Sequence, residues 1–106
     1  MDIIVVNRKK VFGLRDYFMI DIMQSNKAIL GNPFYKDHVS RDERIKRFRT
    51  YLWAELKKMD SLVRLELYSL AQSKKNLALV CCCSPEPCHG DVVKSCLEWL
   101  IKKHKF

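Results

Sequence analysis

The sequence lacks any hydrophobic run long enough to cross a membrane. The longest apolar stretch, residues 77–83, has only seven residues, whereas a membrane-spanning helix requires roughly 20. Residues 3–6 form a shorter apolar run between polar or charged neighbours, which does not resemble an export signal. There is no internal repeat, and 106 residues are too few for two ordinary domains. We therefore expect one soluble, cytoplasmic domain spanning residues 1–106, without membrane contact.

Acidic residues are scarce relative to basic ones. Twelve Asp and Glu against 20 Lys and Arg give a formal net charge of +8. This balance favours nucleic acid, a nucleotide or another polyanion as partner, although excess charge also keeps a small protein in solution. Charge alone leaves both interpretations open.

Four of the five cysteines lie close together, at Cys81, Cys82, Cys83 and Cys88. Without an export signal, they favour a reducing compartment in which neighbouring thiols stay reduced instead of forming disulfides. Such thiols bind a metal, act in catalysis or pack in the core.

The distribution of apolar residues predicts an α/β fold. β-branched and aromatic residues indicate strands at residues 2–7 and 16–22, and the apolar run 77–83 indicates a third, buried strand. We predict a small single-domain sheet of about three to four strands flanked by helices, with the strand 77–83 at its centre.

Helical spacing of apolar residues occupies the middle and the end of the chain. A capping sequence at Ser40 precedes a long helix whose apolar face continues to Met59. A shorter helix is expected over residues 62–71, and the last one begins near Asp91. The chain thus ends in a strand-loop-helix unit, and because ligands of parallel sheets bind beyond the carboxyl ends of strands, we expect the functional site there.

Cys88 and His89 lie where the last helix is expected to begin. Helix N-termini present unpaired N–H groups and a partial positive charge, which stabilise a thiolate and attract phosphate or carboxylate groups. In the catalytic interpretation, Cys88 is a nucleophile activated by the helix and His89, and Asp91 is an acid, a base or an orienting carboxylate. In the structural interpretation, Cys88 is a small buried residue, His89 a hydrogen-bonding loop residue and Asp91 the helix N-cap.

A zinc site is an alternative for the cysteines. Cys81, Cys83, Cys88 and His89 provide three thiolates and one imidazole, a set that zinc accepts in tetrahedral sites, although their spacing is unlike that of zinc fingers. Cys81 and Cys83 would share one face of their strand, and Cys82 would point to the other face and pack there. Our first expectation is no metal cofactor, with structural zinc as the alternative.

Other candidate ligand-binding residues follow strands or lie in loops. They are Asn7, Arg8, Asn32, Pro33, Ser84 and Gly90. The first two directly follow the carboxyl end of the first strand. Asn32 and Pro33 either hold a turn against a ligand, with the Asn32 amide contacting a base edge, or form an Asx-type turn closed by packing of Phe34.

Three residues in the helical patterns are expected to be structural. Trp53 and Trp99 should lie in the core or at an interface rather than act as stacking platforms, and Cys96, on the apolar face of the last helix, should be in the core.

Two separate motifs resemble a known family. They are CCCSPEPCHGD at residues 81–91 and GNPF at residues 31–34, preceded by VVNRK at residues 5–9. In this order they are similar to domain-of-unknown-function family 4326, small α/β proteins common in bacteriophages and bacteria. The resemblance implies the fold and suggests a phage origin, with the host-cell cytoplasm as location, but it implies no activity. The family often has Trp where Cys82 stands here, so no stacking role follows for that position.

Together these features predict a small, phage-encoded α/β protein that binds, or binds and processes, a nucleotide-like phosphorylated ligand at the helix start after Cys88. The alternative is a module that binds nucleic acid or a host protein, with structural or zinc-bound cysteines. Binding follows more directly from these residues than turnover does.

Overall fold

In the part of the chain that the structure describes, three parallel strands form one sheet. The structure, a computed structural model, describes residues 1–11, 13–23, 27–82 and 88–106. In spatial order the strands are β1 (Ile3–Asn7), β3 (Leu77–Cys81) and β2 (Phe18–Asp21). β3 lies in the middle, with Leu77 paired to Ile3 on one side and to Phe18 on the other. The predicted α/β class and the central position of the third strand are confirmed.

β3 is buried on both of its faces. Leu77, Leu79 and Cys81 belong to the core shared with the helices, and Ala78 between them is also fully buried. A strand covered on both faces has a continuous apolar sequence rather than an alternating one. The strand ends at Cys81, earlier than predicted, and Cys82 is exposed, so the expectation that Cys82 packs against the sheet is wrong.

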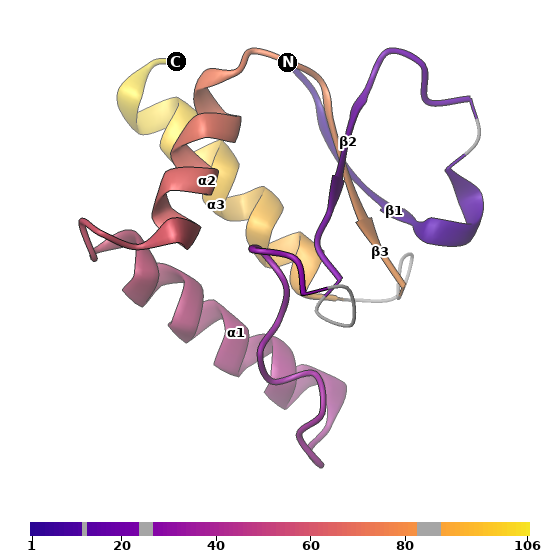
Figure 1. The fold of residues 1–106 in the computed structure, drawn as a ribbon, viewed down its shortest axis with the longest axis vertical. Helices are drawn as coiled ribbons and strands as arrows, with labels where there is room; N and C mark the ends of the chain where they lie inside the picture. Colours follow the sequence, from indigo (N-terminus) through magenta and orange to yellow (C-terminus); the bar gives the residue numbers. More distant parts are fainter. Residues whose placement is uncertain (12, 24–26, 83–87) are drawn as a thin grey trace.

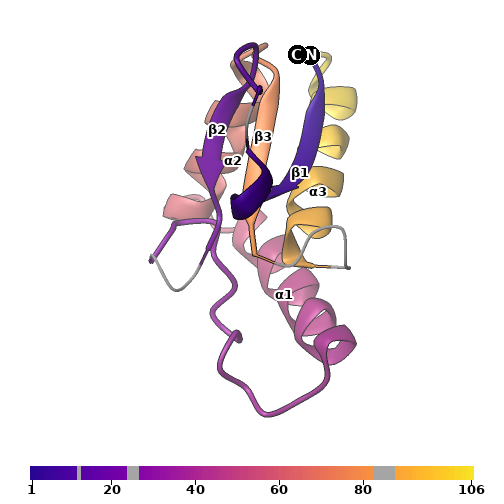
Figure 2. The same cartoon turned by 90° about the vertical axis from the view of Figure 1, so that its right-hand side faces the viewer.

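The three helices lie together on one side of the sheet (Figure 1). They are α1 (Arg41–Leu56), α2 (Leu62–Gln72) and α3 (His89–His104). α3 contacts β1 and β3, and the other two helices pack against α3. The connection from β1 to β2, which includes the 3-10 helix η1 (Arg8–Lys10), lies on the opposite side of the sheet (Figure 2). None of the helices in the described part of the chain is long and apolar enough to span a membrane.

Side-chain caps define the starts of α1 and α2. Ser40 Oγ accepts a hydrogen bond from the Glu43 N–H at 3.1 Å, which confirms the predicted cap. Ser61 Oγ accepts from the Arg64 N–H at 3.2 Å in the same way. Each cap satisfies a backbone donor that has no partner within the first helical turn.

Several apolar residues in the segments predicted to be helical are exposed. Met59 is 80% exposed because α1 ends at Leu56, before that position. Leu62 and Leu65 are 69% and 57% exposed, on the outer side of α2. The buried side of α2 is formed by Val63, Leu67, Leu70 and Ala71.

Candidate functional site

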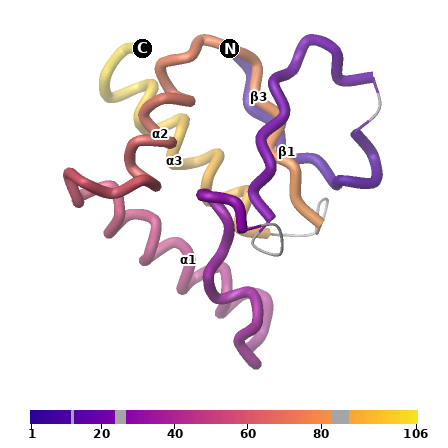
Figure 3. The backbone as a smooth tube through the Cα atoms, in the orientation of Figure 1, coloured from indigo at the N-terminus to yellow at the C-terminus, as the bar shows by residue number. Residues whose placement is uncertain are grey.

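The carboxyl ends of the strands meet at one edge of the sheet, beside the start of α3 (Figure 3). Asn7, the last residue of β1, is paired with Cys81, the last residue of β3. From here the chain leaves β1 toward one side of the sheet, whereas after β3 it continues into α3 on the other side (Figure 2). In open α/β sheets, ligands bind where neighbouring strands diverge in this way. The described residues predicted at the end of β1 and at the start of α3 therefore lie at the same edge of the sheet.

Cys88 is the N-cap residue of α3 and is almost fully buried, with 3% of its surface exposed. Its Sγ donates a hydrogen bond to Cys81 Sγ at 3.3 Å. This bond, followed by burial, raises the pKa of the Cys88 thiol far above its ordinary value, and the opposing effect of the Gly90 N–H is smaller. The expectation that the helix N-terminus lowers the pKa and activates a thiolate is thus reversed, because a buried, hydrogen-bonded thiol favours its neutral form.

Asp91 stabilises the start of α3 through the backbone. Its Oδ2 accepts a hydrogen bond from the Cys88 N–H at 3.1 Å, as the third helical residue does in a capping box. The N-cap is therefore Cys88 and not Asp91, and α3 begins at His89, two residues before the predicted start. The Asp91 side chain is exposed and adds negative charge at this helix end, which opposes binding of an anion directly on the helix N-terminus.

His89 connects α3 to the end of β2. Its Nε2 lies 2.6 Å from the carbonyl oxygen of Ile22, so the neutral ring donates its Nε2–H to that oxygen. The ring also packs edge-to-face on Phe48, with centroids 5.1 Å apart. Burial lowers the pKa of His89, outweighing the opposite effect of the Ile22 hydrogen bond. With Nε2 engaged in this way, His89 holds the two elements together at the site.

Gly90 allows α3 to approach the sheet closely. A methyl group at this position would lie 2.8 Å from Val5 Cγ1, 3.1 Å from Ile22 Cδ1 and 3.2 Å from Cys88 Sγ. These distances are shorter than ordinary carbon contacts of about 3.5–4.0 Å. The residue predicted to bind ligand thus has a clear packing function, and its role in ligand binding stays a prediction.

A cationic turn lies directly beyond β1. Asn7 caps η1 by accepting a hydrogen bond from the Lys9 N–H at 2.9 Å, and its Nδ2 donates to the Cys82 carbonyl oxygen at 3.3 Å. Arg8, Lys9 and Lys10 are all exposed in this turn. Of these, only Arg8 was among the predicted ligand-binding residues. Lys9 and Lys10 could have been identified as well, because the sequence has an uninterrupted run of three cations directly after the strand.

Asn32 has the structural role considered for it. It is 6% exposed, and its Oδ1 accepts a hydrogen bond from the Phe34 N–H at 2.8 Å, which forms an Asx-type turn. Phe34 in turn contacts Tyr51 of α1 edge-to-face, with centroids 6.1 Å apart. Pro33 is exposed at the turn. The turn packs against α1, and contact of Asn32 and Pro33 with a ligand stays a prediction.

The zinc alternative depends on Cys83, which lies outside the described residues, as does Ser84. Among the residues that the structure does describe, no group of three or more His, Cys, Asp or Glu side chains could hold a metal ion. Zinc binding by Cys81, Cys83, Cys88 and His89 therefore stays a prediction. Cys96 is fully buried in the core as expected, and burial raises its pKa to about 12.

Comparison with known proteins identifies the family of the chain. No curated protein and no solved structure matches it. The family model described as domain of unknown function DUF4326 matches residues 3–99, which include the whole sheet and most of α3. The chain therefore belongs to the DUF4326 family, as its two motifs indicated.

Proposed function

We propose that the protein binds a small phosphorylated, nucleotide-like ligand at the carboxyl edge of the sheet, between the ends of β1 and β3. One observation carries this proposal. Three exposed cations in η1 follow β1 at the point where the chain diverges from β3. Arg and Lys side chains are the usual partners of phosphate oxygens, Arg through two parallel hydrogen bonds and Lys as a point charge. Ligands of parallel sheets bind at this kind of position.

The cationic turn is held in place before any ligand arrives. Asn7 joins η1 to the end of β3, because its two amide atoms bond to the Lys9 N–H and to the Cys82 carbonyl oxygen. A turn that is already ordered loses less conformational freedom on binding, which strengthens its affinity for a ligand. Asn7 thus supports the ligand site as a positioning residue for Arg8 and its neighbours.

We propose binding rather than covalent catalysis at this edge. Cys88 is buried, and its raised pKa keeps the thiol protonated at neutral pH, whereas a nucleophilic cysteine requires the thiolate. His89 Nε2 is engaged by the Ile22 carbonyl oxygen instead of Cys88. Both residues hold α3 against the strand ends, which stabilises the binding edge.

Thermal unfolding with AMP, ADP, ADP-ribose and inorganic phosphate tests the proposal. At a ligand concentration 100 times Kd, binding stabilises by about 2.7 kcal/mol, which raises Tm by roughly 10–20 °C for a domain of this size. We expect at least one nucleotide to raise Tm more than phosphate does. No increase with any of the three nucleotides would contradict the proposal.

Two double variants test whether the nucleotide-dependent rise in Tm comes from binding at η1. Changing Arg8→Gln and Lys9→Gln together should abolish the nucleotide-dependent rise, because it removes two of the three cations of η1. The matched control changes Lys46→Gln and Arg49→Gln, two exposed cations of α1, and should retain the rise. Equal loss in both variants would mean that net charge, and not η1, determines binding.

A further inference from the structure

The surface at the junction of the three helices contains a groove at a distance from the proposed ligand site. The groove has a volume of about 450 Å³ and is lined by Trp53, Leu56, Lys57, Arg64, Tyr68, Trp99, Leu100 and Lys103. Trp99 follows His89 by ten positions along α3, which corresponds to roughly 15 Å at 1.5 Å per residue. The groove therefore belongs to the opposite half of α3 from Cys88.

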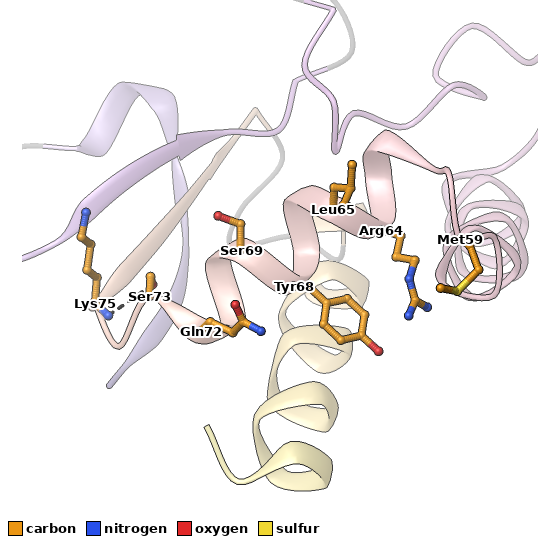
Figure 4. Close-up of a pocket in the computed structure, with 8 residues that line it drawn as sticks. All are labelled: Met59, Arg64, Leu65, Tyr68, Ser69, Gln72, Ser73 and Lys75. Atoms are coloured by element: carbon orange, nitrogen blue, oxygen red, sulfur yellow. Dashed lines mark hydrogen bonds between the residues drawn. The ribbon is translucent and has the colours of Figure 1, made fainter.

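Among the described residues that line this groove, every charged one is a cation. An adjoining hollow of about 690 Å³ on α2 shares Arg64 and Tyr68 with the groove and adds Lys75 as its other charged lining residue (Figure 4). The two depressions together present Lys57, Arg64, Lys75 and Lys103, and none of their lining residues in the described part of the chain is acidic. Such a surface is complementary to an extended polyanion.

Aromatic rings alternate with these cations. Trp53 and Trp99 meet edge-to-face with centroids 5.1 Å apart. Trp99 is 44% exposed, so of the two positions expected for it, core or interface, it does not occupy the core. Lys103 Nζ lies 4.6 Å from the centroid of the Trp99 ring, and the Arg64 guanidinium lies 4.6 Å from that of Tyr68. Each of these two rings is thus accompanied by its own positive charge.

The row of rings extends beyond the groove. The Tyr68 hydroxyl lies 3.3 Å from His104 Nε2, and the two ring centroids are 5.4 Å apart. His104 is stacked on Phe106, with centroids 5.1 Å apart and an angle of 16° between the planes. The rings of Tyr68, His104 and Phe106 therefore continue from the lining of the groove to the last residue of the chain.

We propose that this groove binds single-stranded nucleic acid, an interaction separate from the proposed nucleotide site. A single strand repeats a planar base and a negative phosphate in every nucleotide, which matches paired rings and cations. A base stacked on Trp99 displaces Lys103 from the ring face, and Lys103 then contacts the adjacent phosphate. An acidic peptide would satisfy the cations but would present no repeated planar groups to the rings, so the observations favour the nucleic acid.

The tryptophans provide a direct reporter of binding. Trp53 and Trp99 are the only two tryptophans of the chain, and both line the groove. An oligothymidylate of roughly eight nucleotides, within the range of ordinary single-strand sites, should bind and quench their fluorescence. The oligouridylate of equal length should do the same, because stacking does not depend on the sugar. An abasic strand of equal length and polyglutamate should bind much more weakly and quench little.

Variants separate stacking from charge. Trp99→Ala should weaken oligothymidylate binding roughly 5- to 150-fold, the effect of losing one stacked base, while Trp99→Phe should retain most of the affinity. Lys103→Gln should reduce the slope of log affinity against log salt concentration by roughly 0.7, as expected for one phosphate contact to a single strand. The matched control is Arg15→Gln, an exposed cation in the connection between β1 and β2, which should leave the affinity nearly unchanged.

Three results would overturn the proposal. The first is no binding or quenching by either oligonucleotide. The second is equal affinity for the abasic strand or for polyglutamate, which would make the groove a site for polyanions in general or for an acidic protein. The third is an equal loss of affinity in Arg15→Gln and Lys103→Gln. The nucleotide experiment on η1 can fail or succeed independently of the oligonucleotide experiment, because the Arg8 and Lys9 changes leave the groove intact.

Discussion

Gly90→Ala tests the close contact between α3 and the sheet on which the proposed ligand edge depends. The new methyl group would lie 2.8 Å from Val5 Cγ1 and 3.1 Å from Ile22 Cδ1. Val5 is β-branched and fixed in β1, and Ile22 is fully buried, so neither can move aside without disturbing the packing. Overpacking of this kind costs about 1–3 kcal/mol, whereas Ala gains at most about 1 kcal/mol over Gly in helix propensity. We expect a net loss of about 1–2 kcal/mol.

Urea unfolding followed by circular dichroism measures the free energy of unfolding of the Gly90→Ala variant. The helix-propensity contribution is obtained from Ser95→Gly and Ser95→Ala, at an exposed position of the same helix. There Ala should be more stable than Gly. A Gly90→Ala variant as stable as the original protein would show that α3 does not lie too close to the sheet for a methyl group at this position.

A double-mutant cycle identifies the obstructing group. Val5→Ala removes the Cγ1 atom nearest to the new methyl group, so Gly90→Ala should cost about 1 kcal/mol less in the Val5→Ala background than in the original protein. Additive effects would show that Val5 does not limit the approach of α3. The cycle also distinguishes steric conflict from a general weakening of the helix start.

Two further predictions concern the residues at the start of α3. The pKa of His89 is lower in the folded protein than in the unfolded chain, where it is about 6.5. Between these two pKa values the unfolded chain binds more protons than the folded protein does. The free energy of unfolding should therefore fall as the pH decreases from 7.5 toward 5, by up to about 1.4 kcal/mol per pH unit for this one group. Urea midpoints across this range should show that His89→Gln flattens the dependence, and an unchanged slope would mean that His89 is not buried in its neutral form. Cys88 should react slowly with iodoacetamide at neutral pH because its thiol is buried and its pKa is raised, and the exposed Cys82 should react before it. Peptide mass mapping against time measures this order. Modification of Cys88 before Cys82 would contradict the buried Cys81–Cys88 contact.

The arrangement of the main elements could be predicted from local sequence. The continuous apolar run from Leu77 marked the central strand, because a strand covered on both faces has such a sequence. Ser40 marked the start of α1, because its hydroxyl can satisfy a free backbone donor. Both predictions rest on interactions within a few residues or on burial averaged over a whole strand.

The chemistry of the site depends on contacts that the sequence does not display. His89 bonds to the Ile22 carbonyl oxygen, 67 residues earlier in the chain. Cys88 loses the activation expected at a helix start because Cys81, at the end of β3, hydrogen-bonds to its sulfur. The exposure of Trp99 likewise follows from how three helices meet rather than from the apolar pattern of α3. In each case tertiary packing determines the pKa or the exposure of a residue.

Nuclear magnetic resonance can show directly whether a ligand binds at the carboxyl edge of the sheet. In a titration of the ¹⁵N-labelled protein with ADP, we expect saturable shifts of the backbone amides in η1, at Cys82 and at His89, where β1, β3 and α3 meet. The amides of Trp53 and Trp99 should remain unchanged. Shifts confined to those two residues, or no saturable shift at all, would contradict the account.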